Sequence, residues 1–307
     1  MNTIIIAIIG MAALIALVIM GVHIAVALGA VGFFGLAACI GFEQAMSMVG
    51  IVGYNNIATF DYSVIPLFIM MGMLATAIGI STECYDTLAK WLGKIPGGMG
   101  VATTLGCTAF GTLNGSALVT GSVFAKIAAP EMIRYGYDKN MTYGMIAASG
   151  NIGQFIPPSI MIVIYGALSG DSIGRLLMAA ISPGLALAIG FCALTVGVAI
   201  VKPNVFPKVE ATYTWKEKLV SLKDLIPIVI VAVVIIGGIF SGLFSSSEAG
   251  AIGVLVFLIF AVIKKTPIKK IAGAIMDTIE NAAMLFLILA CSGMFAKFMT
   301  VSGLAPA

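Results

Sequence analysis

Long apolar runs alternate with short polar segments along almost the whole chain. A run of about 20 apolar residues is long enough for a helix to cross the hydrocarbon core of a bilayer. Windows of that length predict membrane spans near residues 3–20, 24–42, 62–81, 142–168, 174–201, 224–243, 247–263 and 281–300. The hydrophobic pattern therefore predicts an all-α polytopic membrane protein.

Composition supports the membrane assignment and excludes several functional classes. Charged residues make up 9% of the 307 residues, against roughly 25% in soluble domains. The five cysteines have no short spacing, so we expect neither a disulfide framework nor a zinc site. A single histidine, His23, excludes metalloprotease and haem patterns, and no basic patch for nucleic acid lies outside the connecting loops. We therefore expect no cofactor and no nucleic-acid partner.

The predicted span at 142–168 contains a polar, helix-breaking stretch, GNIGQFIPPSIMIVIYG, from Gly150 to Gly166. Its unusual members for a span are Asn151, Gln154, Pro157, Pro158 and Ser159. Irregular backbone at membrane depth is tolerated only where it is buried in protein or lines a wet cavity. Secondary transporters hold substrate and coupling ions at such broken helices. The stretch favours a transporter, and a proline kink with locally satisfied polar groups is the alternative.

A second interruption lies in residues 97–129, where two apolar limbs are broken between Gly111 and Gly115. Each limb has about 15 residues, fewer than a crossing helix needs. We therefore predict a re-entrant hairpin with its tip at Thr112 to Ser116. The preceding residues 82–96 mix charged and apolar positions and predict an amphipathic helix along the interface.

The distribution of positive charge supports this topology. If the N-terminus is outside and the hairpin does not cross, the inner loops are 82–96, 126–140, 202–223 and 264–280. All 16 Lys and Arg residues except Arg175 and Lys297 then face the cytoplasm, as the positive-inside rule requires. The loops at 43–60 and 241–247 hold none.

The chain also contains a weak internal repeat. Leu28 to Val31 resembles Ile252 to Leu255, and Gly72 to Ala75 resembles Gly293 to Ala296. The predicted topology places the two copies in opposite orientations, as in many secondary transporters. A second copy as long as the first would extend well past Ala307. We therefore expect a C-terminally truncated chain that does not transport alone.

The two interruptions predict a sodium site and a substrate site. Hard cations take oxygen ligands, which carbonyls of unwound backbone supply. The predicted Na⁺ ligands are Asn114, Gly115, Gly150, Asn151 and Gly153. The predicted substrate-binding residues are Asn114, Ser116, Gln154, Pro157, Pro158 and Ser159.

The order of several motifs resembles the large membrane subunit of the tripartite ATP-independent periplasmic (TRAP) transporters. These motifs are the NGS tip, PEMIRYGYD (Pro130 to Asp138), the broken segment Gly150 to Gly166, SIGRLLMAAISPGL (Ser172 to Leu185) and FSSSEAGAIGV (Phe244 to Val254). The resemblance covers essentially the whole chain. The sequence differs from the family pattern in Asn114, where Thr or Ser is commoner, and in the amides Asn151 and Gln154.

The resemblance implies an inverted-repeat, elevator-type importer driven by Na⁺. The implied parts are scaffold spans in 1–81, an arm helix in 82–96, a transport domain in 97–201, a cytoplasmic loop in 202–223, scaffold spans and an arm in 224–280, and the start of the remaining half in 281–307. The hairpin 97–129 and the discontinuous helix 142–168 belong to the transport domain.

The resemblance also implies partners and a location. An extracytoplasmic solute-binding protein delivers an organic acid, a small four-helix membrane subunit braces the scaffold, and the chain lies in the bacterial inner membrane with a periplasmic N-terminus. A stand-alone Na⁺- or H⁺-coupled anion permease of a related elevator fold is the alternative. An intramembrane enzyme is not expected, because the sequence has neither HExxH nor paired membrane aspartates.

Overall fold

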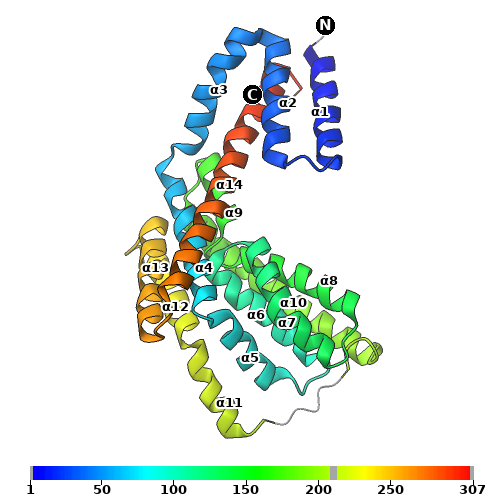
Figure 1. Ribbon diagram of the computed structural model, residues 1–307, viewed down its shortest axis with the longest axis vertical. Coiled ribbons are helices and arrows are strands. Elements are labelled where there is room, and N and C mark those ends of the chain that lie inside the picture. The colour runs from blue at the N-terminus through cyan, green and yellow to red at the C-terminus, as the bar shows by residue number, and fades with distance from the viewer. Residues whose placement is uncertain (1–2, 208–212, 305–307) are drawn as a thin grey trace. The chain divides into compact units, whose positions relative to one another are not determined.

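The computed structural model describes residues 3–207 and 213–304. The regular structure of these residues is helical, without strands (Figure 1), so the all-α prediction is confirmed. The packing divides the chain into two compact units. The first unit runs to Tyr62 and resumes at Ile279, and the second runs from Ser63 to Thr278. Each unit is described by itself.

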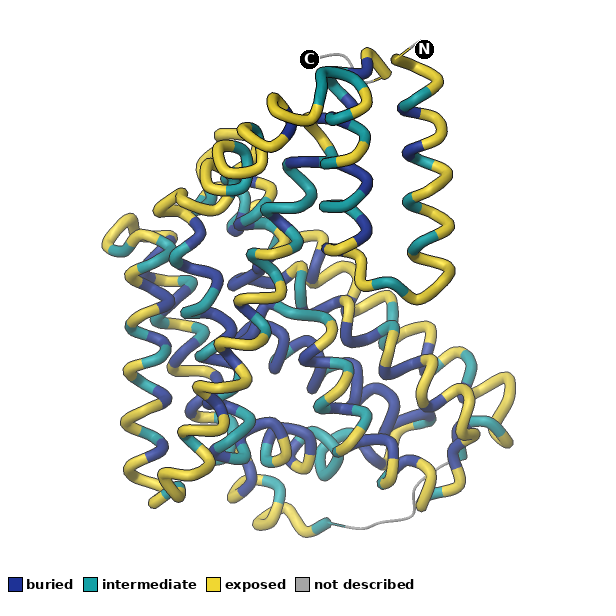
Figure 2. The backbone as a smooth tube through the Cα atoms, turned by 45° about the horizontal axis from the view of Figure 1, so that its top comes forward, coloured by how far each residue is buried: buried dark blue, intermediate teal, exposed yellow. Residues whose placement is uncertain are grey.

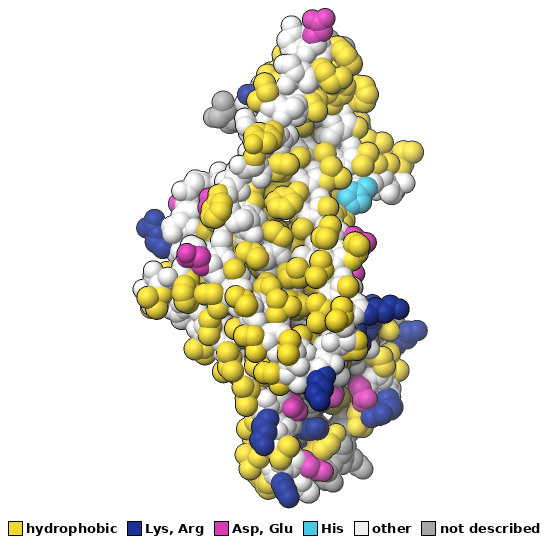
Figure 3. Space-filling view, turned by 60° about the vertical axis from the view of Figure 1, so that its left-hand side comes forward, with side chains coloured by type: hydrophobic (Ala, Val, Ile, Leu, Met, Phe, Trp, Pro, Cys, Tyr) yellow, Lys and Arg dark blue, Asp and Glu magenta, His cyan; other side chains and the backbone are white. Residues whose placement is uncertain are grey.

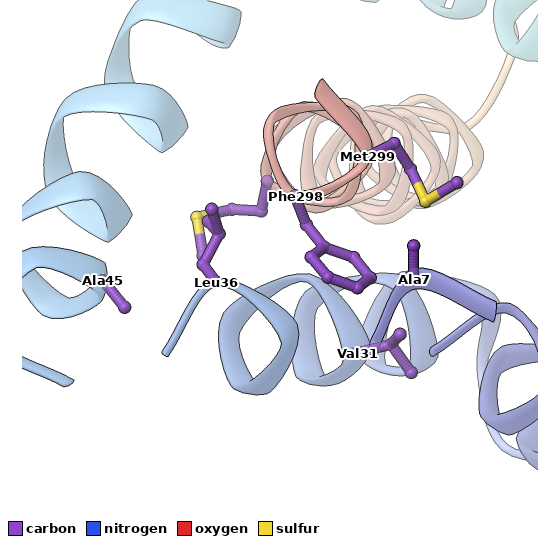
Figure 4. Packing of buried hydrophobic residues seen from close by; sticks show 7 residues of the cluster. Ala7, Val31, Leu36, Ala45, Phe298 and Met299 are labelled. Atoms are coloured by element: carbon purple, nitrogen blue, oxygen red, sulfur yellow. The ribbon is translucent and has the colours of Figure 1, made fainter. Parts of the chain in front are cut away.

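The first unit contains four helical segments, and an aromatic ring of one of them packs against two others. They are α1 (Thr3–Ile19), α2 (Ile24–Ile40), α3 (Phe42–Ile57) and the last part of α14 (Ile268–Val301). Phe298 of α14 is fully buried, and Figure 4 shows it pointing toward Val31 of α2 and Ala7 of α1. A Cβ atom on Gly35 would lie 2.6 Å from this ring. The missing side chain at Gly35 therefore makes room for Phe298.

The second unit contains most of the helices. They are α4 (Val64–Ala77), α5 (Ile80–Leu92), α6 (Gly98–Asn114), α7 (Ala117–Arg134), α8 (Lys139–Ile152), α9 (Ile160–Ser169), α10 (Ile173–Val201), α11 (Trp215–Ser221), α12 (Ile226–Phe240), α13 (Ser246–Ile263) and the start of α14. Short 3-10 turns occur at Phe60–Ser63, Gly153–Phe155 and Leu222–Leu225. In Figure 2 the buried stretches concentrate where these helices cross one another.

Helix α6 is the centre of the second unit. It is buried along nearly its whole length and contacts α4, α5, α7, α8, α10 and α12. Its residues are mostly Gly, Ala and Thr, whose small side chains let neighbouring helices approach closely. The Thr103 hydroxyl donates to the Met99 carbonyl, and the Thr104 hydroxyl lies 3.0 Å from that of Ser149 on α8. These hydrogen bonds satisfy polar groups that have no water to bind.

Every predicted span contains a helix, but several observed helix boundaries differ from the predicted ones. Helices apolar and long enough to cross a membrane are Phe60–Ala77, Ile173–Val201, Trp215–Phe240, Ser246–Ile263 and Ile268–Val301. The bent pair of α8 and α9 adds one more, while α1 and α2 are apolar but shorter. The expected loop at 43–60 is wrong, because α3 occupies Phe42–Ile57. The absence of Lys and Arg there identified a segment without positive charge, not one without helix.

The predicted hairpin and the predicted second arm also have different bounds. The hairpin extends to Arg134, beyond the predicted end at 129, because α7 continues through Pro130. The break is confined to Gly115 and Ser116, since α6 remains helical from Gly111 to Asn114. Residues 268–280 of the predicted arm and the span at 281–300 merge into the single helix α14 of 34 residues.

Charged and hydrophobic side chains separate on the surface. On the face in Figure 3, many Lys and Arg side chains and several acidic ones gather over one end of the second unit, and most other coloured side chains on this face are hydrophobic. Charge gathered at one end of a largely apolar surface is the pattern expected of a unit surrounded by lipid.

Two reciprocal glycine contacts support the internal repeat. In the first unit a Cβ atom on Gly29 of α2 would lie 2.9 Å from Cys291 Sγ of α14. In the second unit a Cβ atom on Gly253 of α13 would lie 2.4 Å from Met71 Sδ of α4. Gly29 and Gly253 are the matched glycines of the repeat. In each unit the helix that carries the matched glycine, α2 or α13, packs on a helix of the other copy, α14 or α4, through the same kind of contact.

Replacing Ser245 by alanine is expected to destabilise the start of α13 by about 1 kcal/mol. The Ser245 hydroxyl accepts from the Glu248 N–H, and the Glu248 carboxylate accepts from the Ser245 N–H at 2.7 Å, which completes a capping box. Thermal unfolding in detergent measures the effect. Ser246→Ala, one residue inside the helix, is the matched control, and equal losses in both variants would contradict this account.

Candidate functional site

The tip of the helical hairpin meets the break in the discontinuous helix. At the tip, α6 ends at Asn114, Gly115 adopts a left-handed conformation with φ of +61°, and α7 begins after the extended Ser116. The discontinuous helix consists of α8, the 3-10 turn Gly153–Phe155 and α9, and its two limbs differ in direction by 46°. The predicted interruption is confirmed, and the peptide between Pro157 and Pro158 is cis.

The two interruptions are in direct contact through their backbones. The Ile160 N–H donates to the Gly115 carbonyl at 3.4 Å. A Cβ atom on Gly115 would lie 2.6 Å from the Pro158 carbonyl oxygen. One turn earlier, a Cβ atom on Gly111 would lie 2.1 Å from Gly153 Cα. Glycine is therefore required at this junction, because any side chain would separate the two backbones.

Serine caps begin both outgoing helices. Ser116 caps α7 by accepting from the Val119 N–H, and Ser159 caps α9 by accepting from the Ile162 N–H, each at 3.4 Å. Both serines have the same extended backbone conformation. The junction thus joins two helix N-termini, of partial positive charge, to the C-termini of α6 and α8, of partial negative charge. Such ends suit an anionic group and a cation, respectively.

Asn114 is buried at the hairpin tip, and its side chain holds the tip together. Its Oδ1 accepts from the Ser116 N–H at 2.7 Å and from the Thr120 hydroxyl at 3.2 Å. Its Nδ2 lies 3.1 Å from the same hydroxyl. An amide oxygen has two lone pairs, so both are occupied in this arrangement. The geometry assigns Asn114 a structural part in the turn, whatever else it binds.

The side chains of Asn151 and Gln154 form hydrogen bonds within their own segment rather than with the tip. Asn151 is exposed, its Nδ2 donates to the Ala147 carbonyl, and its Oδ1 accepts from Gln154 Nε2 at 3.5 Å. Successive residues of a helix point about 100° apart. Because Gly150 faces α7, the next residue, Asn151, turns away from it.

Gly150 and Gly153 serve as contact points for the hairpin. A Cβ atom on Gly150 would lie 3.1 Å from Gly121 Cα on α7. Gly150 and Asn151 belong to the last turn of α8 rather than to the unwound stretch, which begins at Gly153. The last four carbonyls of a helix have no partner within it. Their oxygens are therefore placed to serve as ligands even though the helix is not unwound there.

The structure adds residues that the sequence pattern did not single out. Thr120 binds the tip amide from the second turn of α7, and Ser149 joins α8 to α6 through Thr104. Their signal is only a hydroxyl residue within an apolar run, which many structural threonines share. Gly72 of α4 is a third case, because its Cβ atom would lie 2.1 Å from Asn114 Cβ.

The junction carries no acidic cluster. Within residues 3–207 and 213–304, no three His, Cys, Asp or Glu side chains converge as they do at a transition-metal site. A cation held here would be bound by neutral oxygens, the set that Na⁺ accepts and Zn²⁺ does not.

A polytopic helical protein in which a helical hairpin and a broken helix meet end to end has the architecture of a secondary transporter. The profile of the family described as "Tripartite ATP-independent periplasmic transporter, DctM component" matches residues 11–307, so the chain belongs to that family. This confirms the resemblance read from the motifs. The family consists of transporter subunits, so the chain is not an enzyme, and it is a multi-pass protein of the inner membrane.

Several characterised relatives show how broad the family is. The chain is 31% identical over 271 residues to the ectoine TRAP transporter large permease protein TeaC of Halomonas elongata, covering 87% of this chain and 61% of the relative. It is 30% identical to the C4-dicarboxylate TRAP transporter large permease protein DctM of Pseudomonas aeruginosa, covering 77% and 55%. It is 28% identical to the isethionate TRAP transporter permease protein DctMQ of Oleidesulfovibrio alaskensis, covering 92% and 44%. The chain thus spans 44% to 61% of the length of these relatives.

Proposed function

We propose that the chain is the large permease subunit of a Na⁺-coupled TRAP transporter that imports an organic acid. The observation that carries the proposal is the junction of four helix ends, two of each polarity, at Gly115 and Ser159. Membership of the DctM family gives the junction its context. The ectoine, C4-dicarboxylate and isethionate named for the relatives each contain an acidic group, so an organic acid is the common substrate class.

Sodium is proposed to bind on the side of the helix C-termini. The end of α6 supplies the carbonyls of Asn114 and Gly115, and the last turn of α8 supplies those of Gly150 and Asn151, with Gly153 beyond it. Gly115 O accepts one long hydrogen bond from Ile160, which leaves its second lone pair available. The partial negative charge of these helix ends favours a cation without any carboxylate.

The substrate's acidic group is proposed to bind on the side of the helix N-termini. Ser116 and Ser159 stand at the starts of α7 and α9, where backbone N–H groups attract an anion. Asn114 and Gln154 supply amide groups beside them, and the buried Pro157 and Pro158 shape the wall.

Transport is proposed to follow an elevator mechanism, in which residues 97–201 move against a scaffold. An extracytoplasmic solute-binding protein delivers the substrate, a small four-helix membrane subunit supports the scaffold, and the N-terminus is periplasmic. The observed compact units divide the chain elsewhere, grouping α4, α12 and α13 with the hairpin. The proposed boundary between scaffold and moving domain therefore passes within the second unit.

Uptake in proteoliposomes is the test of this function. The complete gene product that contains these 307 residues is reconstituted with its small membrane subunit and its binding protein, and labelled organic acids are supplied outside. We expect accumulation only with an inward Na⁺ gradient and only with the binding protein. Uptake that persists with K⁺ in place of Na⁺ would reject the coupling, and uptake without the binding protein would favour a stand-alone permease.

A further inference from the structure

A polar cavity of about 180 Å³ lies at the base of the hairpin, the end opposite its tip. Its walls come from α5, the turn after it, the start of α6 and the end of α7. The charged residues that line it are Asp86, Lys90, Lys94, Glu131 and Arg134. The cavity lies within the second unit and shares no residue with the junction described above.

The positive charges of the cavity exceed what its carboxylates neutralise. Arg134 forms an ion pair with Glu131 at 2.9 Å and stacks on the Tyr135 ring. Lys90 and Lys94 form no ion pair with any residue in the described parts of the chain. Asp86 is the remaining carboxylate of the lining, where partial burial raises its pKa and the neighbouring Lys90 opposes that rise. Two lysines therefore face the cavity with at most one carboxylate against them.

We propose that this cavity binds a phosphate group, with Lys90 and Lys94 as its cationic partners. A phosphate has several acceptor oxygens and negative charge, which match two ammonium groups. A simple carboxylate offers fewer oxygens for the same set of donors.

The phosphate has two chemical sources, a free phosphate ion and the headgroup of an anionic lipid. Beside the cavity, Trp91 and Trp215 pack edge to face at 6.3 Å, and the Lys218 ammonium lies 5.7 Å from the Trp91 ring centroid. Tryptophan and lysine gather at the headgroup level of membranes. A lipid headgroup would therefore reach the cavity from the bilayer surface.

Binding here would join two elements that the whole of α6 separates along the chain. Lys90 belongs to α5, whereas Glu131 and Arg134 belong to the end of α7. A bound phosphate would hold α5 against the base of the hairpin, at the end opposite the tip. The ligand would act as a stabiliser of this position rather than as a transported substrate.

Ligand-dependent melting of the purified chain tests the proposal. The probes are inorganic phosphate, a short-chain phosphatidic acid and a short-chain phosphatidylcholine, each titrated in detergent. We expect saturable stabilisation by phosphatidic acid and a weaker effect of phosphatidylcholine, which carries no net charge. Saturable stabilisation by inorganic phosphate as well would identify a site open to the free ion, and its absence would identify a lipid site.

Variants distinguish binding at this cavity from a general effect of positive charge on the protein surface. The double variant Lys90→Gln/Lys94→Gln is expected to weaken binding by at least about tenfold, since charge-assisted hydrogen bonds are lost. Lys269→Gln/Lys270→Gln, exposed on α14, is the charge-matched control. No saturable binding of any probe, or equal losses in the control, would overturn the proposal.

Discussion

Replacing Gly111 by alanine is expected to disrupt the junction between the hairpin and the discontinuous helix. The added Cβ atom would lie 2.1 Å from Gly153 Cα and 2.7 Å from Gly153 C, both backbone atoms. A rotamer change cannot relieve a clash with backbone, so the two helices must separate. Overpacking in a well-packed interior costs about 1–3 kcal/mol, and more where nothing yields, so the loss is expected at or above the top of that range. Thermal unfolding in detergent and the monodisperse yield measure it.

A glycine elsewhere on the same discontinuous helix provides the control. Gly144 lies inside α8, and a Cβ atom there would meet nothing within 4 Å. Alanine is favoured over glycine in a helix interior by up to about 1 kcal/mol. Gly144→Ala is therefore expected to leave the melting temperature unchanged or raise it. A Gly111→Ala protein as stable as wild type would show that the two helices are not in contact at this point.

The sequence located the interruptions well because glycine, proline and amides are rare inside membrane spans. Gly115 and the segment from Gly153 to Ser159 are irregular in the structure, as the pattern predicted. The same reasoning could not define the helical limbs. The hairpin was predicted to end at residue 129, yet α7 continues through Pro130 to Arg134. Composition also could not distinguish an uncharged loop from the uncharged helix α3.

The sequence could not predict which residues meet at the junction, because that depends on which face each helix turns toward its neighbours. Asn151 and Asn114 have the same side chain and similar contexts, and the hypothesis treated them as equivalent ligands. The helical rotation of α8 exposes Asn151, while the left-handed turn at Gly115 folds the chain back over Asn114. Thr120, six residues from Asn114, has no periodic relation that would reveal their hydrogen bond. Only the three-dimensional turn brings them together.

The tight packing behind Asn114 explains why this amide is held in one place. Gly72 of α4 lies so close that a Cβ atom there would overlap Asn114 Cβ. On its other side the amide binds Ser116 and Thr120 of the same tip. Asn114 is thus fixed from both sides, whereas Asn151 has only local hydrogen bonds and open surroundings.

Replacing Asn114 by alanine is therefore expected to weaken sodium dependence far more than replacing Asn151. The first change leaves the Ser116 N–H and the Thr120 hydroxyl without their acceptor, at a cost of about 1–3 kcal/mol for each buried group left unpaired. The tip would then lose the geometry that places the Asn114 and Gly115 carbonyls. The second change removes exposed hydrogen bonds that contribute little. Sodium titrations of uptake by the complete gene product measure both variants.

Thr120→Val distinguishes tip geometry from direct ligation. It removes the hydroxyl that binds Asn114 while leaving the Asn114 amide in place. If Asn114 acts by holding the tip, Thr120→Val shifts the sodium titration in the same direction as Asn114→Ala but by less. If the Asn114 oxygen binds sodium itself, Thr120→Val frees one of its lone pairs and leaves the affinity equal or higher. An unchanged sodium titration curve in Asn114→Ala would show that the hairpin tip is not part of the sodium site, because this change removes the hydrogen bonds that hold the tip in place.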